Sequence, residues 1–394
     1  MTLLQTLRHS REKRFLLIAA SVAFLAIGAS QAIYGPFYAV FREIFDLSAA
    51  RVALTTTFHF AGGTTSLIVT GFLVRRLGGV RVMIVAAIAL TLGFVVIALA
   101  PGFLFLLLGA LVVGLGFGGL QVLNFMVARI FVEHRGAALN LLNSMFSIGA
   151  ILAPLAAAPF VLQGTYRPLF GIIAVLGLVV IVLVSLQPRR LGHEAAGSSG
   201  GGFAGWPVLL TVAGFTVFYL VYVGAEASFT NWIPTHLSLT HDLGFSAQMA
   251  GLFWAALTLG RLLMIPVSDR ISPAVLVTMS VGVAGLISLA ARIPDVAPFA
   301  YLLAGFFMGP IFPGGLAWIA ERFPENSTPI SAFVMAGGGF GAVVFPPAIG
   351  SMVDTFDPSI IPVSITFVLA AALATALVLR LSGRRRRRLE SSAS

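Results

Sequence analysis

Cysteine is absent from this 394-residue sequence, and charged residues are scarce, at 10% of the chain. The first absence excludes disulfide frameworks, thiolate metal sites and cysteine nucleophiles. The scarcity of charge accompanies 58% hydrophobic residues and a mean hydropathy of +1.01. No soluble protein could bury that much apolar surface, so the sequence predicts that lipid surrounds most of the chain.

Motifs for nucleotide, metal or nucleophile chemistry are also missing. The sequence has no Walker motif, metal-ligand cluster or nucleophile–base pair, so an enzyme, a bound cofactor or metal, and an ATP-driven pump have no support. Residues 114–119 match G-x-G-x-x-G, but they lie inside an apolar run and follow no strand, which excludes a dinucleotide site. The net charge of +10 comes from basic residues beside apolar runs. This pattern indicates contact with lipid headgroups and argues against nucleic-acid binding.

Twelve apolar runs are long enough to cross a bilayer, which takes about 20 helical residues. Most of the 24 Lys and Arg residues lie at those ends of the apolar runs that share a membrane side with the N-terminus. The ends on the opposite side of the membrane hold only Arg42, Arg51, Arg167 and Arg292. The positive-inside rule therefore predicts cytoplasmic N- and C-termini in a bacterial-type inner membrane. Breaks at Pro, Gly and charges place the predicted helices at 15–40, 50–74, 80–100, 102–132, 136–160, 166–187, 207–237, 246–268, 273–292, 297–321, 328–353 and 360–381.

One segment rich in charge, Gly and Ser interrupts the apolar runs. This segment, residues 188–206, is predicted to be a cytoplasmic linker. It separates an N-terminal six-helix bundle at 1–187 from a C-terminal six-helix bundle at 207–383, which a basic tail follows at 384–394. The predicted fold class is an all-α membrane protein of twelve transmembrane helices in two bundles.

The two halves also resemble each other in sequence. Residues 149–154 are GAILAP and residues 341–346 are GAVVFP, at matching places in the fifth and eleventh helices. In the first and seventh helices, Ser30 and Glu226 follow the same Gly-Ala pair. Two parallel repeats with a site at the bilayer midplane between them are typical of transporters.

A single carboxyl group lies within the apolar interior of a predicted helix. Glu226 shares one face of helix 207–237 with Tyr219, Tyr222 and Thr230. A charge at the bilayer centre costs roughly 2.5–3.5 kcal/mol on insertion scales, so such residues are typically functional. We predict that Glu226 carries a proton, the alternative being a structural hydrogen bond. His59, a lone histidine within the predicted second helix, is a second candidate for proton transfer. The alternative is that His59 is a packed hydrogen-bond partner.

Four stretches carry a resemblance to a known family: residues 139–154, 222–237 and 311–324, and Gly260-Arg261. They resemble the major facilitator superfamily and, within it, the fucose permease branch of sugar–proton symporters. The superfamily pattern covers almost the whole chain, and the branch resemblance covers mainly helices 4, 5, 7, 8 and 10. The resemblance implies secondary active transport by alternating access.

The sequence departs from this family in two places. The superfamily's loop after the second helix usually carries Gly-x-x-x-Asp-Arg/Lys-x-Gly, and here Arg75 occupies the position of the acid and Arg76 follows it. The second-half copy keeps Asp269 and Arg270, and the resemblance implies that this acid latches the inner gate. We predict gating roles for these four residues and for Arg129 near the inner end of the fourth helix.

Fucose permeases also tend to carry acids in helices 1 and 4. The first helix here has no acid before Glu43, and the fourth offers Gln121 and Asn124 instead. The branch's own route of sugar–proton coupling therefore does not transfer residue by residue. The fifth helix keeps Gly149 and Pro154 of an antiporter-type Gly-rich motif, but alanines stand where further glycines are usual.

Amide and phenol side chains lie in stripes on several predicted helices. They suit a neutral, hydroxyl-rich solute, because each supplies hydrogen-bond donors or acceptors, and polar contacts between helices are the alternative. Arg261 shares a face with Trp254 and lies about 10 Å further inward than Glu226, at 1.5 Å per residue, so it either contacts substrate or belongs to the inner gate. The predicted solute-binding residues are Gln31, Tyr34, Gln121, Asn124, Asn143, Tyr222, Asn231, Trp254 and Arg261.

The leading hypothesis is a proton-coupled symporter for a small polar solute, a sugar by this interpretation. The alternatives are a carrier of organic anions (carboxylates) that uses Arg261, a drug or metabolite efflux antiporter, and a receptor or scaffold that does not transport. The expected partners are the solute, protons and the lipid bilayer, and the expected state is a monomer.

Overall fold

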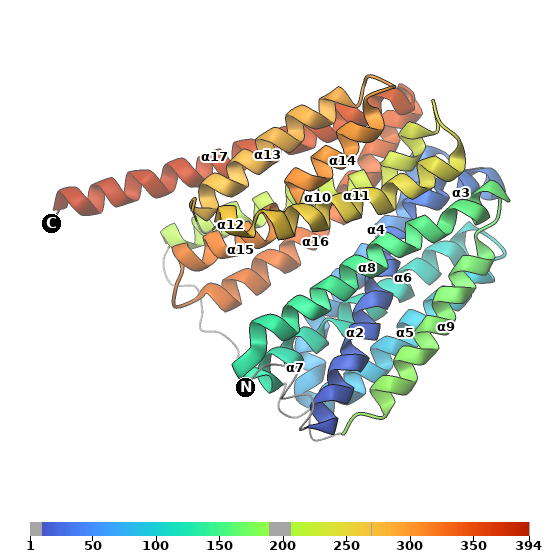
Figure 1. The fold of residues 1–394 in the computed structure, drawn as a ribbon, viewed down its shortest axis with the longest axis horizontal. Helices are drawn as coiled ribbons and strands as arrows, with labels where there is room; N and C mark the ends of the chain where they lie inside the picture. The colour runs from blue at the N-terminus through green and yellow to red at the C-terminus, as the bar shows by residue number, and fades with distance from the viewer. Residues whose placement is uncertain (1–9, 189–205, 269, 394) are drawn as a thin grey trace. The chain divides into compact units, whose positions relative to one another are not determined.

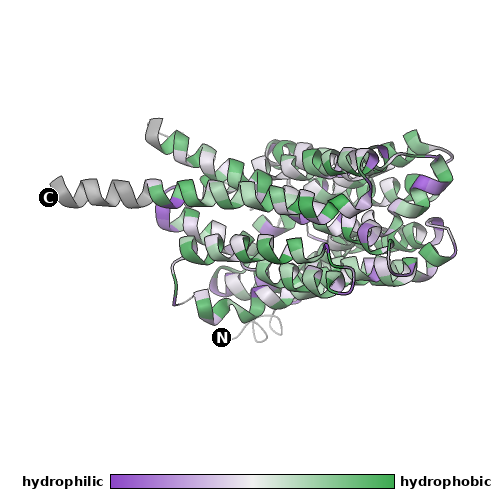
Figure 2. Ribbon diagram, turned by 90° about the horizontal axis from the view of Figure 1, so that it is seen from above, coloured by the Kyte–Doolittle hydropathy of each residue, from purple (hydrophilic) through white to green (hydrophobic). Residues whose placement is uncertain are grey.

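The computed structural model describes residues 10–188, 206–268 and 270–393. All regular structure in these residues is helical, and hydrophobic residues cover most of the helix length (Figure 2). Twelve helical spans in the described residues are long and apolar enough to cross a membrane, which confirms the predicted fold class. The spans are Arg11–Phe45, Ala49–Leu77, Gly79–Ala98, Phe103–Ile130, Val132–Leu162, Arg167–Ser185, Val208–Leu237, Leu243–Leu263, Pro273–Ala290, Ala297–Arg322, Pro329–Thr355 and Pro358–Ser382.

The chain divides into two compact units (Figure 1). The described part of residues 1–198 packs with residues 233–252 in the first unit, and the second unit holds 253–394 and 199–232 as far as they are described. The bundle boundaries drawn at the linker stay a prediction, because residues 189–205 of the predicted linker lie outside the described residues. The helices of the first half are α2 (Arg11–Ala32), η1 (Gly35–Phe37), α3 (Tyr38–Phe45), α4 (Ala49–Leu77), α5 (Gly79–Ala98), α6 (Phe103–Leu120), α7 (Val122–Ile130), η2 (Val132–His134), α8 (Arg135–Leu162) and α9 (Arg167–Ser185).

The second half continues the helical pattern (Figure 1). Its helices are α10 (Trp206–Leu237), α11 (Leu243–Leu263), α12 (Ile265–Ser268), α13 (Pro273–Ala290), α14 (Ala297–Met308), α15 (Ile311–Arg322), α16 (Ser327–Thr355), η4 (Pro358–Ile360) and α17 (Ile361–Ala393).

Three spans that the sequence predicts as single helices are broken inside the membrane. The first changes to a 3₁₀ turn at Gly35, where Pro36 lacks a backbone N–H and so cannot continue the α-helical pattern. The fourth ends α6 at Leu120 and restarts as α7 after Gln121. The tenth breaks between α14 and α15, around Gly309 and Pro310.

Glycines let neighbouring helices approach closely beside buried polar side chains. A Cβ atom on Gly114 of α6 would collide with the backbone carbonyl of His59 on α4. In the second unit, a Cβ on Gly260 of α11 would collide in the same way with the carbonyl of Phe306 on α14. Small residues have this role in membranes because lipid supplies no hydrophobic force to drive helices together.

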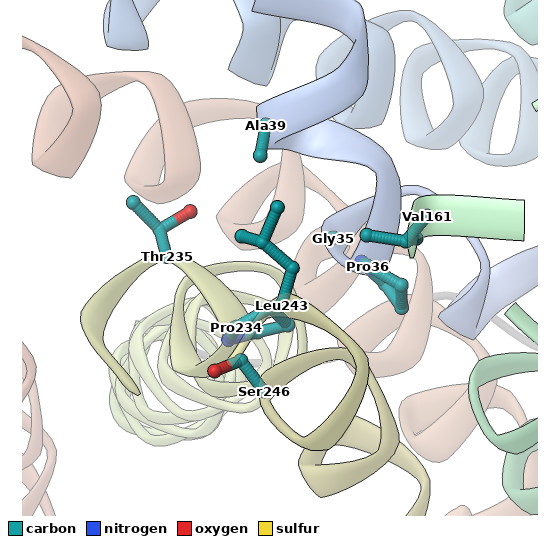
Figure 3. Close-up of a pocket in the computed structure, with 8 residues that line it drawn as sticks. All are labelled: Gly35, Pro36, Ala39, Val161, Pro234, Thr235, Leu243 and Ser246. Carbon is teal, nitrogen blue, oxygen red and sulfur yellow. The ribbon is translucent and has the colours of Figure 1, made fainter. Parts of the chain in front are cut away.

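One small pocket lies in the first unit and can be followed in Figure 3. Its volume is about 10 Å³, which leaves room for about one water molecule. It is therefore no solute site. It is lined by Gly35, Pro36, Ala39, Val161, Pro234, Thr235, Leu243 and Ser246.

Candidate functional site

A buried acid–phenol pair lies in the second unit, on α10. The Tyr222 hydroxyl donates a hydrogen bond to Oε2 of Glu226 at 2.6 Å, and both side chains are buried. The two residues are four positions apart and so lie one above the other on the same helix face. The Tyr222 oxygen also lies 3.3 Å from the backbone carbonyl oxygen of Met308, at the end of α14. The phenol therefore connects the acid to the break between α14 and α15.

That break is held by polar groups from two other helices. Pro313 has no N–H, so the carbonyl of Gly309, four residues earlier, has no helical donor. Nε of Arg261, on α11, donates to this carbonyl oxygen at 3.3 Å. The Tyr219 hydroxyl, on α10, donates to the carbonyl oxygen of Phe312 at 2.7 Å.

Arg261 lies beside the acid–phenol pair without bonding to Glu226. Its side chain is half-buried, and the Gly309 carbonyl that it contacts follows directly on the Met308 carbonyl that Tyr222 contacts. No ion pair joins Arg261 to Glu226, although the structure describes both residues.

Two other predicted solute-binding residues lie within the packing of the second unit. Nδ2 of Asn231 donates to the carbonyl oxygen of Ala227 on its own helix at 2.7 Å, and the side chain is buried. Trp254 is buried on α11, one turn before Thr258, whose hydroxyl donates to the Trp254 carbonyl oxygen. Both residues therefore lie deeper in the unit than their place in a polar stripe suggests.

The first unit has its own buried polar pair, formed by Tyr34 and His59. The Tyr34 hydroxyl lies 3.3 Å from Nδ1 of His59 on α4, and the two rings are in contact, with centroids 5.4 Å apart. Nε2 of His59 is buried and has no hydrogen-bond partner in the part of the chain that the structure describes. The ring of Phe117, on α6, packs 5.2 Å from the His59 ring. One nitrogen of His59 is thus paired, and the other lies among apolar groups.

The predicted amide residues of the first half are less buried. Nδ2 of Asn124 donates to Oε1 of Gln121 at 3.1 Å, and both side chains are half-buried beside the break between α6 and α7. Gln31 is also half-buried, on α2. Asn143, on α8, is exposed and donates to the Leu139 carbonyl oxygen.

The predicted gate residues lie at helix ends. Arg75 and Arg76 are exposed in the last turn of α4, with the guanidinium of Arg76 over the Phe72 ring at 4.4 Å from its centroid. Arg129, in the last turn of α7, and Arg270 are also exposed. Asp269 lies outside the described residues.

Three further polar groups at buried positions are not predicted from the sequence. Two are the backbone carbonyls of Met308 and Gly309, and their signal in the sequence is the pair of prolines, at 310 and 313, that interrupts the tenth span. The third is Thr56 of α4, whose hydroxyl lies 2.7 Å from the Tyr38 hydroxyl. No local pattern pairs Tyr38 with Thr56, because the two residues lie on different helices.

Twelve long apolar helices, with a buried carboxyl group and a buried histidine among them, are typical of a multi-pass membrane protein with a functional site inside the bilayer. Residues 20–301 match the family model described as the Major Facilitator Superfamily, and the chain belongs to this family. It is a transporter and not an enzyme.

The chain is similar to several known transporters. It is 29% identical over 368 residues to a protein described as a probable nitrate/nitrite transporter, NarK2, of Mycobacterium tuberculosis, covering 88% of this chain and 89% of that protein. It is 21% identical over 343 residues to the glucose/mannose transporter GlcP of Bacillus subtilis, covering 83% and 85%. The solved fucose:proton symporter of E. coli shares the fold, with a TM-score of 0.62 and 16% identity over 93% of this chain and 99% of that one. The predicted resemblance to sugar–proton symporters is confirmed.

Proposed function

We propose that this protein is a proton-coupled symporter for a small, uncharged polar solute, a sugar, and that Glu226 carries the proton. The observation that supports this most is the buried hydrogen bond between Tyr222 and Glu226. Ionisable groups inside a membrane protein typically mark proton or substrate pathways. Here the group is also connected, through the Tyr222 hydroxyl, to the break between α14 and α15.

The Tyr222 hydroxyl has one hydrogen and two acceptors within reach, Oε2 of Glu226 and the carbonyl oxygen of Met308. When Glu226 is ionised, the hydrogen stays with the carboxylate, because a bond to a charged acceptor is the stronger one. When Glu226 is protonated, its own O–H donates to the phenol oxygen, and the Tyr222 hydrogen turns to the Met308 carbonyl. Proton binding at α10 thereby changes the hydrogen bonding of the break between α14 and α15.

The solute in this proposal contacts the amides of the first half. Gln121 and Asn124 present an amide pair beside the break in the fourth span, and amides suit the hydroxyl groups of a sugar, because they both donate and accept. The relatives that transport sugars, GlcP and the fucose:proton symporter, support this class of solute. We further propose that both termini face the cytoplasm, as the distribution of Lys and Arg predicts.

The test is uptake by the purified chain in proteoliposomes. Candidate sugars are first ranked by the rise in melting temperature that they cause, because a ligand that binds the native state stabilises it. The best sugar should then accumulate when an inward proton gradient is imposed and should only equilibrate without one. Uptake that ignores the gradient would contradict proton coupling, and stabilisation by carboxylates or nitrate alone would contradict the sugar assignment.

A second candidate is a carrier of small anions, organic or inorganic, and it rests on Arg261. This guanidinium lies half-buried beside a buried acid, in a chain that is 29% identical to the nitrate/nitrite transporter relative. A planar guanidinium can hold a carboxylate or nitrate through two parallel hydrogen bonds. Only one of its nitrogens, Nε, donates to the Gly309 carbonyl oxygen.

The variants Arg261→Lys and Arg261→Ala should separate the two candidates. If the protein carries an anion, both variants should lose binding, because Lys cannot reproduce the two-point contact. If Arg261 only supports the break between α14 and α15, it does not contact the solute. Affinity for the best solute should then stay within about twofold while the transport rate falls. Binding is measured by melting-temperature titration and rate by counterflow. Arg292→Ala, at an exposed arginine after α13, is the control, and both affinity and rate should match the wild type.

A further inference from the structure

A second cavity lies in the second unit, away from the acid–phenol pair. It has a volume of about 430 Å³ and is lined by residues of α10, α13, α15 and α17. This volume is in the usual range for small-molecule sites, about 300–1,000 Å³. Among the described residues, none of α11 or α16 lines it, so it does not include Arg261. In Figure 1, α13 lies along α17 at this side of the unit.

Among the described residues, the charged groups that line this cavity are unequal in sign. Arg322, at the end of α15, and Arg380, on α17, contribute two guanidinium groups, and Glu321 contributes one carboxylate. The first turn of α13 lines the cavity as well, through Ser272 and the residues that follow Pro273. A helix N-terminus adds partial positive charge to that of the two arginines. The lining therefore favours an anion.

The other lining side chains include apolar and aromatic ones. The ring of Trp318 meets that of Phe215 edge-on, with centroids 5.1 Å apart, and both residues line the cavity. Arg380 lies two residues before the end of the last apolar span, at Ser382. Arginine and tryptophan at this height are typical of the membrane–water interface, where lipid phosphates lie. The lining thus combines two guanidinium groups with aromatic and apolar side chains near the ends of two apolar spans.

We propose that this cavity binds the phosphate group of an anionic phospholipid, held by Arg322 and Arg380, with the lipid's apolar part against Trp318. Planar guanidinium groups match phosphate oxygens, and basic pockets between membrane helices bind anionic headgroups. A soluble phosphate compound would use the same two arginines, so the experiment must separate the two sources. The site needs neither the acid–phenol pair nor any assumption about the transported solute.

The test uses the full chain in nanodiscs and measures quenching of Trp318 fluorescence by brominated phospholipid. The Trp318 signal is the difference between the wild type and Trp318→Phe, which removes the contribution of the other tryptophans. Brominated phosphatidylglycerol should quench this signal at a lower lipid fraction than brominated phosphatidylcholine. The double variant Arg322→Gln/Arg380→Gln should weaken the apparent affinity for phosphatidylglycerol about 25-fold, at about fivefold for each arginine near a lipid surface. Glu321→Gln should change it in the opposite direction, by up to about fivefold, because a repulsive charge is removed.

The matched control is Arg81→Gln/Arg135→Gln, which removes two exposed arginines from α5 and α8 and leaves the cavity unchanged. An even number of spans separates these residues from Arg322 and Arg380, so all four lie on one membrane face. The control should bind phosphatidylglycerol as the wild type does. Equal quenching by the two lipids, equal loss in the control, or no loss in the cavity variant would overturn the proposal.

A soluble arm distinguishes the source of the phosphate. Inorganic phosphate and glycerol 3-phosphate are titrated into nanodiscs made of phosphatidylcholine alone, and the melting temperature is measured. For a lipid site, neither compound should stabilise the protein at low millimolar concentration, and neither should displace brominated phosphatidylglycerol. Stabilisation that disappears in the arginine double variant would support the phosphate site and assign it to a soluble compound. Stabilisation that persists in that variant would overturn the site.

Discussion

The Glu226→Gln variant is expected to exchange solute across the membrane but to lose the ability to concentrate it. Glutamine keeps the shape of the protonated acid, and its amide can still hydrogen-bond the Tyr222 hydroxyl, which lies 2.6 Å from the carboxylate in the wild type. It cannot take up or release a proton. In proteoliposomes with an imposed pH gradient, the internal solute concentration should therefore reach the external one and stop there, while counterflow without a gradient continues.

Tyr222→Phe is the companion variant, because it keeps the carboxyl group and removes only the phenol hydroxyl. It should still accumulate solute, since Glu226 can still be protonated, but more slowly, since the link to the Met308 carbonyl is lost. If the glutamine variant still concentrates solute in response to the pH gradient, Glu226 is not the proton carrier. His59, with one buried nitrogen unpaired among the described residues, is then the next candidate, and His59→Gln receives the same assay.

Gly260→Ala is expected to destabilise the protein strongly. An added Cβ would collide with the backbone carbonyl of Phe306, and a backbone group cannot rotate away as a side chain can. Overpacking of this kind typically costs about 1–3 kcal/mol, and the same contact holds α11 against α14, where Arg261 reaches the Gly309 carbonyl. We expect a lower melting temperature in detergent and a reduced monodisperse fraction.

Gly282→Ala is the matched control, because its added Cβ would meet only the Leu373 side chain, at an ordinary 3.7 Å. This variant adds the same methyl group to another helix of the unit, α13, and should leave the melting temperature almost unchanged. Equal melting temperatures for the two variants would show that α11 and α14 are not packed as closely as the structure places them.

Hydropathy alone determined the twelve spans, because each span needs only its own side chains to be soluble in lipid. The breaks within the spans were harder to predict from the sequence. The sequence shows the prolines at 36 and 310, but proline in a membrane helix is often tolerated without a break, so continuous helices were predicted there. The break at Gln121 has no proline at all, so the sequence carries no such signal for it.

For the candidate site, too, the sequence predicts some contacts and the tertiary structure decides the others. The pairing of Tyr222 with Glu226 follows from the sequence, because a spacing of four residues on one helix fixes their proximity. The contact of Tyr34 with His59, and those of Tyr222 and Arg261 with the carbonyls of Met308 and Gly309, join different helices. Helical periodicity says which residues share a face but not which neighbouring helix that face meets. Only the tertiary packing, set by glycines such as Gly114 and Gly260, decided those partners.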